Sequence, residues 1–386
     1  MIQRESVTVR AIAIAWAVAM IGGGNLPANQ SESFVDGVSP GSLFRYGVHS
    51  LKWTADANGN ALMDLGEVES ERAGQWEPLT KGEFDHTVKR RRLLMYMPNA
   101  YIYKKTPTRD LTLYIDFPTE WKATDKRPVM LWFFGGAWNT GDPAAFKPQA
   151  DYFAKRGVVG ICVDYRTRTM DDIRGDGYIS AQDGKTAIRW VRKNAASLGI
   201  DPDQVMAGGD SAGGHLAVAT QIATLNDPAD DLSISGSVSA LLLHNPYVVR
   251  INDKCWVFQL DFKTLPPVWI AYGGKDVAAY TDDPTTARTT QNGESFIRKL
   301  QQAGATLRTY IKEECRHGFC SGGPHLNPST RDMDDFLQSC GLLPAPIAEV
   351  PGEIMRQVVS RHMQKASAGE LPRSVPRVLE FANKAN

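Results

Sequence analysis

Blocks of apolar residues recur between residues 93 and 343, and their spacing predicts strands and helices. Residues 95–105 and 110–118 alternate apolar with polar side chains, as expected of antiparallel strands at a sheet edge. Residues 127–136 contain a continuous apolar run bounded by Pro128 and Gly135, which predicts a central strand buried on both faces. Similar runs predict buried strands at residues 158–166, 204–210, 238–246 and 266–276, and a last strand at residues 307–313.

Helices are predicted between these strands. Asp142-Pro143 begins one that ends at Gly157, and residues 186–198 carry an apolar stripe that ends before Gly199. Others are predicted after Ser211, at residues 296–303 and at residues 330–339. Strands that alternate with helices indicate the α/β class, with a mainly parallel central sheet covered by helices on both faces. Functional residues are then expected at the carboxyl ends of strands.

One tight turn joins a predicted strand to a helix, with Ser211 at its centre. Gly209-Asp210-Ser211-Ala212-Gly213 matches the Gly-x-Ser-x-Gly elbow, where glycines let the backbone bend so that the serine hydroxyl projects from the sheet edge. The helix that follows directs its free N–H groups and the positive end of its dipole toward this point. Ser211 is therefore the candidate nucleophile of an acyl transfer.

Candidate partners for this serine stand at the ends of later strands. Asp276 ends the strand at residues 266–276, and His317 follows the last strand. A serine hydroxyl needs a base that takes its proton, and a carboxylate can hold that base in the correct tautomer. We predict His317 as the base and Asp276 as the acid. The order Ser, Asp, His excludes the chymotrypsin-like and subtilisin-like arrangements.

Other residues compete for these roles. Asp282 and Asp283 are alternative acids, while His325 and His244 are alternative bases. Asp276 and His317 could themselves be ordinary turn and loop residues. His215, on the helix after the elbow, is expected to pack or to lie on the helix surface.

A longer run extends the elbow into a family resemblance. Residues 183–215, DGKTAIRWVRKNAASLGIDPDQVMAGGDSAGGH, resemble many bacterial esterases of the hormone-sensitive-lipase-like and carboxylesterase branch of the α/β-hydrolases. Phe134-Gly135-Gly136-Ala137 resembles the HGGG loop of that branch, with Phe134 in place of histidine and Ala137 in place of the third glycine. The resemblance covers residues 93–343.

The resemblance implies an α/β-hydrolase fold, and an oxyanion hole made by the backbone N–H groups of Gly135, Gly136 and Ala212. Residues 245–266 leave little chain for a lid, which predicts a small or absent lid and an open site for short acyl groups. Trp138, Tyr247 and Trp256 are the candidate pocket residues.

The predicted activity is hydrolysis of carboxylic esters through an acyl-enzyme. Its substrate would be a small ester or an acylated polymer, and catalysis would need no cofactor. A formamidase or a serine peptidase on the same fold is the first alternative, because a fold does not determine a substrate. A catalytically silent, hydrolase-like binding module is the second.

The N-terminal residues resemble a targeting segment. Arg4 and Arg10 precede a short apolar run at residues 11–24, so residues 1–28 are predicted to be a signal peptide of an exported protein without a membrane span in its mature form. A buried N-terminal helix is the alternative, since Glu5 is unusual in a signal peptide. Residues 344–386 form a C-terminal extension without a predicted role.

A second resemblance lies in the segment of residues 29–92, where a short helix is predicted after Ser42 and leads to a loop at residues 56–67. This loop resembles an EF-hand calcium loop, with Ala61 where that family has glycine. An Asn- and Gly-rich surface turn is the alternative. The predicted calcium ligands are Asp56, Asn58, Asn60, Leu62, Asp64 and Glu67.

The charge and the cysteine content bear on the possible partners and on possible disulfides. Lys plus Arg and Asp plus Glu both number 43, and this zero net charge argues against a nucleic-acid partner. Cys162 is predicted to be a buried strand residue, and the other four cysteines could form two disulfides outside the cytoplasm. Those four are Cys255, Cys315, Cys320 and Cys340.

Overall fold

The structure is a computed structural model that describes residues 43–46, 49–54, 57, 66–72, 74–80, 99–175, 177–250, 252–281, 291–345 and 377–379. The chain divides into two compact units, Met1–Tyr96 with Arg361–Val378 and Met97–Ser360 with Leu379–Asn386. The short strand β13 (Arg377–Leu379) crosses this division. Across the described ranges, no helix combines the length and the apolar character that a membrane span requires.

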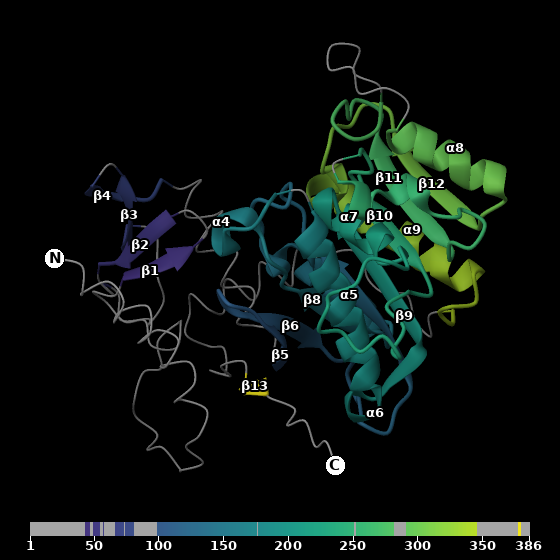
Figure 1. Ribbon diagram of the computed structural model, residues 1–386, viewed down its shortest axis with the longest axis horizontal. Helices are drawn as coiled ribbons and strands as arrows, with labels where there is room; N and C mark the ends of the chain where they lie inside the picture. Colours follow the sequence, from purple (N-terminus) through teal and green to yellow (C-terminus); the bar gives the residue numbers. More distant parts are fainter. Residues whose placement is uncertain are drawn as a thin grey trace. The chain divides into compact units, whose positions relative to one another are not determined.

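The smaller unit contains an antiparallel sheet in the order β1-β2-β3-β4 (Figure 1). The short helix predicted after Ser42 is wrong, because β1 and β2 occupy that stretch. The alternation of apolar and polar residues in His49–Trp53 has the period of a strand. The bounds are β1 (Leu43–Tyr46), β2 (His49–Trp53), β3 (Val68–Arg72) and β4 (Gln75–Pro78).

The predicted calcium loop connects strands in this sheet. Trp53 of β2 pairs with Val68 of β3, whereas an EF-hand loop connects two helices. Glu67 is buried, and its Oε1 accepts a hydrogen bond of 2.8 Å from the N–H of Ala57. The other predicted ligands lie outside the described residues: Asp56, Asn58, Asn60, Leu62 and Asp64. Calcium binding therefore stays a prediction.

The larger unit is built on a sheet with the strand order β12-β11-β10-β9-β7-β8-β6-β5. From β12 to β8 all neighbours pair in parallel, while β6 and β5 run antiparallel at the other side. The mainly parallel sheet with antiparallel edge strands is confirmed. The bounds are β5 (Asn99–Lys105), β6 (Asp110–Asp116), β7 (Arg127–Phe133), β8 (Val159–Val163), β9 (Ile200–Asp210), β10 (Leu241–His244), β11 (Val268–Gly273) and β12 (Leu307–Lys312).

Helices cover both faces of this sheet, as predicted (Figure 1). Gly184 of α5 packs against Phe133, which pairs in register with Val163, while Ala150 of α3 packs against Gly160. Side chains alternate along a strand, so Gly160 and Val163 of β8 face opposite sides and α3 and α5 cover opposite faces. The helices are α3 (Lys147–Lys155), α4 (Arg168–Asp171), α5 (Tyr178–Lys193), α6 (Ala195–Leu198), α7 (Ala212–Ala219), α8 (Gly293–Ala303) and α9 (Leu326–Ser339).

Two helix boundaries differ from the prediction. The helix predicted at residues 186–198 already begins at Tyr178 and is interrupted at Asn194, and α9 begins at Leu326. In the first turn of α5, Ser180 Oγ donates a hydrogen bond of 2.8 Å to Arg166 O, a tertiary contact that apolar periodicity does not reveal. Short 3-10 helices complete the unit: η1 (Pro143–Phe146), η2 (Asp253–Cys255), η3 (Val257–Gln259), η4 (Phe319–Ser321) and η5 (Gly323–His325).

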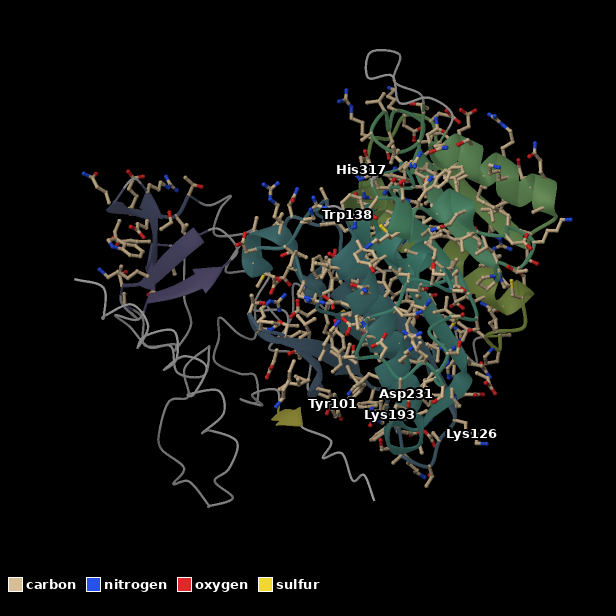
Figure 2. The ribbon with its side chains drawn as sticks, viewed as in Figure 1. Tyr101, Lys126, Trp138, Lys193, Asp231 and His317 are labelled. Atoms are coloured by element: carbon tan, nitrogen blue, oxygen red, sulfur yellow. The ribbon has the colours of Figure 1, made fainter. Side chains whose placement is uncertain are left out.

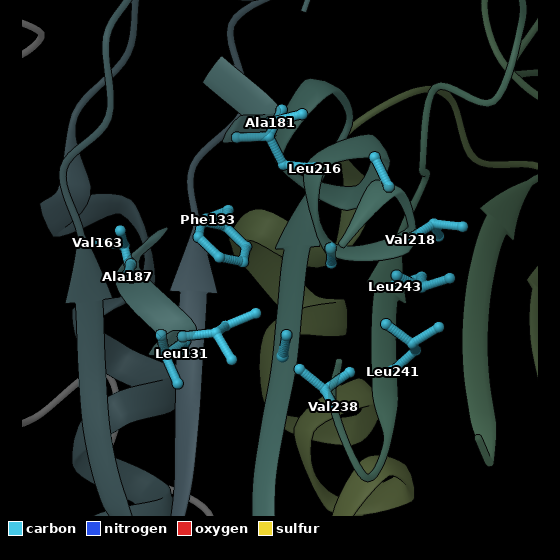
Figure 3. Packing of buried hydrophobic residues seen from close by; sticks show 14 of the residues in the cluster. Leu131, Phe133, Val163, Ala181, Ala187, Leu216, Val218, Val238, Leu241 and Leu243 are labelled. Carbon is cyan, nitrogen blue, oxygen red and sulfur yellow. The ribbon is translucent and has the colours of Figure 1, made fainter. Parts of the chain in front are cut away.

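A hydrophobic core fills the space between the sheet and α5 and α7. Leu131 and Phe133 of β7 and Leu241 and Leu243 of β10 project from one face and are fully buried (Figure 3). Burial of such a side chain contributes about 1.5–3 kcal/mol, so this layer holds β7, β9 and β10 firmly together. The strand ends that carry the elbow are thereby placed on a rigid support.

The opposite face carries an aromatic layer. The ring of Trp132 stacks on Phe146 at 4.8 Å, and His244 lies between Trp132 and Trp269. Trp269 Nε1 donates a hydrogen bond of 2.7 Å to Asp332 of α9. This layer connects the sheet to η1, α3 and α9.

None of the five cysteines is part of a disulfide. Cys162 is fully buried in β8, which confirms its predicted place in a strand. The two disulfides considered for the other four cysteines are not formed in the structure.

Candidate active site

Ser211 lies at a strained bend between β9 and α7. Its φ of 54° and ψ of −115° place a residue with a side chain in a rarely populated region. A Cβ at Gly209 would lie 2.5 Å from the carbonyl oxygen of Phe133, and one at Gly213 only 2.1 Å from it. Both positions therefore require glycine, because β7 passes directly beside the bend.

Hydrogen bonds hold the bend in place. Ser211 N donates to His244 O at 2.9 Å, and Tyr247 N donates to Ser211 O at 3.0 Å. Among the described residues, no group forms a hydrogen bond with the Ser211 hydroxyl. The backbone of the serine is thus fixed, while its Oγ stays available to a reactant.

Asp276 and His317 are brought together at the ends of β11 and β12. His317 Nδ1 donates to Asp276 Oδ2 at 2.7 Å. Asp276 is 1% exposed, and its Oδ1 accepts hydrogen bonds from Ala278 N and Ala279 N. The carboxylate therefore holds the proton on Nδ1, so Nε2 of the imidazole is left free to accept a proton.

The environment of His317 favours its protonated form. Burial is the largest effect and lowers the pKa of the imidazole, but the hydrogen bond that His317 donates to Asp276 and the charges of Asp276 and Asp210 outweigh it. The pKa is consequently raised above its usual 6.5. A base with this pKa is matched to chemistry near neutral pH.

This shift predicts a pH dependence for any activity that needs neutral His317. Activity should fall as the pH drops through the raised pKa, so the acidic limb of kcat/KM is expected to have its midpoint above 6.5. In Asp276→Asn that midpoint should move to lower pH, since the amide does not stabilise the imidazolium. The measurement is kcat/KM against pH for both proteins, and a midpoint unchanged by the substitution would contradict the assignment.

Asp210, beside the nucleophile, connects three parts of the site. Its Oδ1 accepts a hydrogen bond from Asn245 at 3.3 Å, and its Oδ2 accepts one from Ser321 at 3.2 Å. Burial raises the pKa of this carboxyl, partly opposed by the nearby His317. The contact with Ser321 ties the loop that carries His317 to the elbow. Sequence reasoning missed this role, and the only signal was an acidic residue inside the glycine turn.

The predicted oxyanion loop faces the elbow. A Cβ at Gly135 would lie 3.3 Å from Ser211 Cβ and 3.0 Å from Asp210 O. Within the described ranges, the backbone N–H groups of Gly135, Gly136 and Ala212 make no hydrogen bond. Ala212 opens α7, where the first N–H groups of a helix are free. The structure thus brings the three predicted donors to the same region as Ser211.

Phe134 and Ala137, the two departures from the HGGG pattern, have identifiable structural consequences. The ring of Phe134 stacks on Tyr165 at 4.0 Å, and the Tyr165 hydroxyl donates a hydrogen bond of 2.6 Å to Phe134 O. This stack holds the loop without a histidine. Ala137 and Trp138 both have positive φ, 54° and 57°, which costs on the order of 1 kcal/mol for each.

Gly135→Ala is a direct test of this loop. The new methyl group would press on Asp210 and Ser211, so the loop must move away from the nucleophile. Because loss of one oxyanion donor costs about 10²–10³ in rate, kcat should fall by that factor while KM changes little. Steady-state kinetics measures this, with Gly322→Ala as a nearby control, because a Cβ there meets nothing within 4 Å and its φ of −176° is extended backbone that any residue adopts. A large rise in KM alone would argue against the oxyanion role.

The three candidate pocket residues differ in the contacts that they make. Trp138 is 4% exposed, and its ring contacts Tyr247 edge-on at 5.7 Å and His215 at 5.3 Å. Tyr247 is bonded to the Ser211 backbone, so Trp138 and Tyr247 belong to one aromatic wall. Trp256 instead stacks on Phe258 at 6.4 Å. In Figure 2, Trp138 and His317 lie toward the same end of the larger unit.

The competing histidines have other environments. His244 is buried in the aromatic layer, and burial lowers its pKa to about 3. Buried His215 packs as predicted, with Nε2 3.0 Å from Cys255 O, and burial lowers its pKa to about 4. His325 lies 3.4 Å from the Cys315 thiol. Asp282 and Asp283 lie outside the described residues.

Comparison with known proteins gives several matches. The BD-FAE family model matches residues 115–240. The probable isoprenylcysteine alpha-carbonyl methylesterase ICMEL1 of Oryza sativa is 35% identical over 31% of this chain and 27% of its own length. Carboxylesterase NlhH of Mycobacterium tuberculosis is 32% identical over 33% of this chain and 40% of its own length.

Solved structures match over a longer stretch. A thermophilic esterase of the planctomycete Thermogutta terrifontis, solved with bound propionate, is 32% identical with a TM-score of 0.59. The match covers 66% of this chain and 98% of that one. This chain therefore spans nearly all of the esterase structure but less than a third of the rice relative.

Proposed function

Because this chain belongs to the carboxylesterase branch of the α/β-hydrolase superfamily, we propose that it hydrolyses carboxylic esters with Ser211 as nucleophile. The observation that carries this proposal is the hydrogen bond of 2.7 Å between His317 Nδ1 and Asp276 Oδ2, on strand ends of the sheet that bears the strained Ser211. The Asp276 carboxylate is also buried, and its Oδ1 accepts hydrogen bonds from two backbone N–H groups. An ordinary surface aspartate would need neither feature.

In the proposed first step, Ser211 Oγ attacks the ester carbonyl carbon and His317 Nε2 takes the hydroxyl proton. The C–O bond to the alcohol then breaks, and the imidazolium returns the proton to the leaving alkoxide. In the second step, water attacks the acyl-enzyme, and His317 again accepts and returns a proton. Asp276 holds the imidazole and stabilises its cation throughout. This sequence of steps uses no cofactor.

The tetrahedral intermediate carries a negative oxygen. Gly135, Gly136 and Ala212 are proposed to donate their backbone N–H groups to it. The positive end of α7 adds to this stabilisation, since the helix begins beside Ser211. The Phe134–Tyr165 stack positions the loop before substrate arrives, so no reorganisation is needed during the reaction.

A fluorophosphonate probe tests the proposed nucleophile directly. The activated serine should displace fluoride from phosphorus and become covalently labelled, which intact mass spectrometry detects. Absence of labelling would instead favour the silent binding module. A panel of ester, formamide and peptidyl substrates then separates the esterase from the formamidase and the peptidase. Faster turnover of an amide than of the matched ester would reject the esterase proposal.

Short acyl groups are the proposed substrates. In the described part of residues 245–266, the secondary structure consists of the short helices η2 and η3. Trp138 and Tyr247 form an aromatic wall, with their rings edge-on at 5.7 Å. The bound propionate in the Thermogutta esterase supports the same size class. We expect p-nitrophenyl acetate to be hydrolysed at least about tenfold faster than the palmitate ester. The opposite order would contradict the size argument.

Export and calcium binding are separate proposals. Residues 1–28 are proposed to be removed during export, and mass spectrometry of the mature N-terminus would test this. Calcium at residues 56–67 is proposed as a structural ion. The loop joins the paired strands β2 and β3, so an ion bound there would hold these two strands together. Calorimetric titration with calcium would detect binding, and no heat would remove the proposal.

A further inference from the structure

A cluster of three side chains of types that can ligate a metal, Glu314, Cys315 and His325, lies close in the chain to His317 and has no part in the proposed reaction. The Cys315 thiol is 3.4 Å from His325 Nε2 and 3.9 Å from Glu314 Oε1. One donor atom from each residue lies within 4.8 Å of the others. Cys315 and His325 are partly exposed and Glu314 is exposed, so an ion could enter from solvent.

We propose that Glu314, Cys315 and His325 bind a divalent transition-metal ion of the zinc type. Thiolate, imidazole and carboxylate are the ligands that zinc uses, and the single thiolate and the carboxylate balance its two positive charges. The hard ions Mg²⁺ and Ca²⁺ prefer oxygen ligands alone. The three ligands leave a fourth position open for water. The ion would then have four ligands, which is the coordination number usual for zinc.

The present spacing already suits such an ion. Zinc binds sulfur at about 2.3 Å and nitrogen at about 2.0–2.1 Å, so two tetrahedral ligands of this kind stand roughly 3.5 Å apart. The observed separation of Sγ and Nε2, 3.4 Å, is almost the same. The longer separation of Sγ and the carboxylate, 3.9 Å, needs only a small rotation of the exposed Glu314 side chain.

Two of the ligands are held by their surroundings. Cys315 sits in a turn after β12, where its N–H donates to Lys312 O and its carbonyl accepts from Lys275 N at 2.9 Å. His325 directly precedes α9, and its ring contacts Phe319 edge-on at 5.3 Å. Binding therefore requires little ordering of these two residues, which favours affinity.

The position of the site couples it to the loop of the proposed base. Cys315 and His325 stand on either side of His317 in the chain, so a shared ion would close residues 315–325 into a loop. The Cys315 carbonyl is bonded to the residue before Asp276. The ion would thus brace both loops that carry the hydrogen-bonded Asp276 and His317.

Metal binding by the full-length, untagged protein tests the proposal. After dialysis against Zn²⁺ with a phosphine reductant, elemental analysis should find one equivalent bound, and Co²⁺ should give thiolate-to-cobalt charge-transfer absorption. A hundredfold excess over Kd should raise Tm by about 5 °C. Cys315→Ser should lose the absorption and the Tm shift, and Glu314→Gln should weaken binding about tenfold.

Cys340→Ser is the matched control, because Cys340 is also a free, partly exposed thiol. It should keep full Zn²⁺ stoichiometry and the cobalt spectrum. Unchanged Tm values of all variants without metal would show that folding is intact. The proposal is overturned if the wild-type protein binds no zinc, or if Cys315→Ser retains the same stoichiometry and spectrum. These readouts do not depend on ester hydrolysis, so the two proposals can fail separately.

Discussion

Ser211→Ala is expected to lower kcat/KM for a short ester by about 10⁶ and to abolish fluorophosphonate labelling. The alanine retains the β9–α7 bend but has no oxygen to form the acyl-enzyme. The oxyanion donors and the binding site remain, so a residual rate above that of water is expected. Stopped-assay kinetics at high enzyme concentration and intact mass spectrometry give the two readouts.

Ser321→Ala is a suitable control for this experiment. Its hydroxyl is exposed and bonded to Asp210 Oδ2, so it is another serine of the same region. We expect this variant to keep its fluorophosphonate label. Labelling that persists in Ser211→Ala and disappears in Ser321→Ala would show that the nucleophile has been assigned incorrectly.

Asp276→Asn has the second largest expected effect, a fall in kcat of about 10⁴. The amide has nearly the same shape, but it has one acceptor oxygen where the carboxylate now serves both His317 Nδ1 and the backbone N–H groups of Ala278 and Ala279. The imidazole then loses its correct tautomer and the charge that stabilises its cation. Steady-state kinetics measures the loss, and circular dichroism checks that the fold is retained.

Asp334→Asn is the matched buried control. Asp334 is 3% exposed and pairs with Arg156 at 2.6 Å, and it lies on α9, an element that carries none of the predicted site residues. Breaking this buried pair should lower Tm but leave kcat/KM near the wild-type value. Asp282→Asn and Asp283→Asn should also stay active. If one of them lost activity as strongly as Asp276→Asn does, the acid would have to be reassigned.

Several features of this protein follow from local sequence. The apolar run at residues 127–136 and the turn at Gly209–Gly213 predict a buried strand and a sharp elbow, because burial and backbone freedom are properties of neighbouring residues. The period of two in the antiparallel edge strands is equally local. The helix predicted after Ser42 failed because pairing between strands outweighed the weak local preference of this short segment.

Contacts between residues distant in the chain were decided only by the tertiary structure. His244, His317 and His325 are equivalent as sequence letters, but packing buries the first, and the ends of β11 and β12 bring the second to Asp276. The Phe134–Tyr165 stack and the bond from Ser321 to Asp210 likewise depend on parallel strands meeting at one edge. Sequence alone therefore determined the elbow and most strands and helices of the larger unit, because these depend on neighbouring residues. The tertiary structure decided which distant side chains meet, because long-range packing places them.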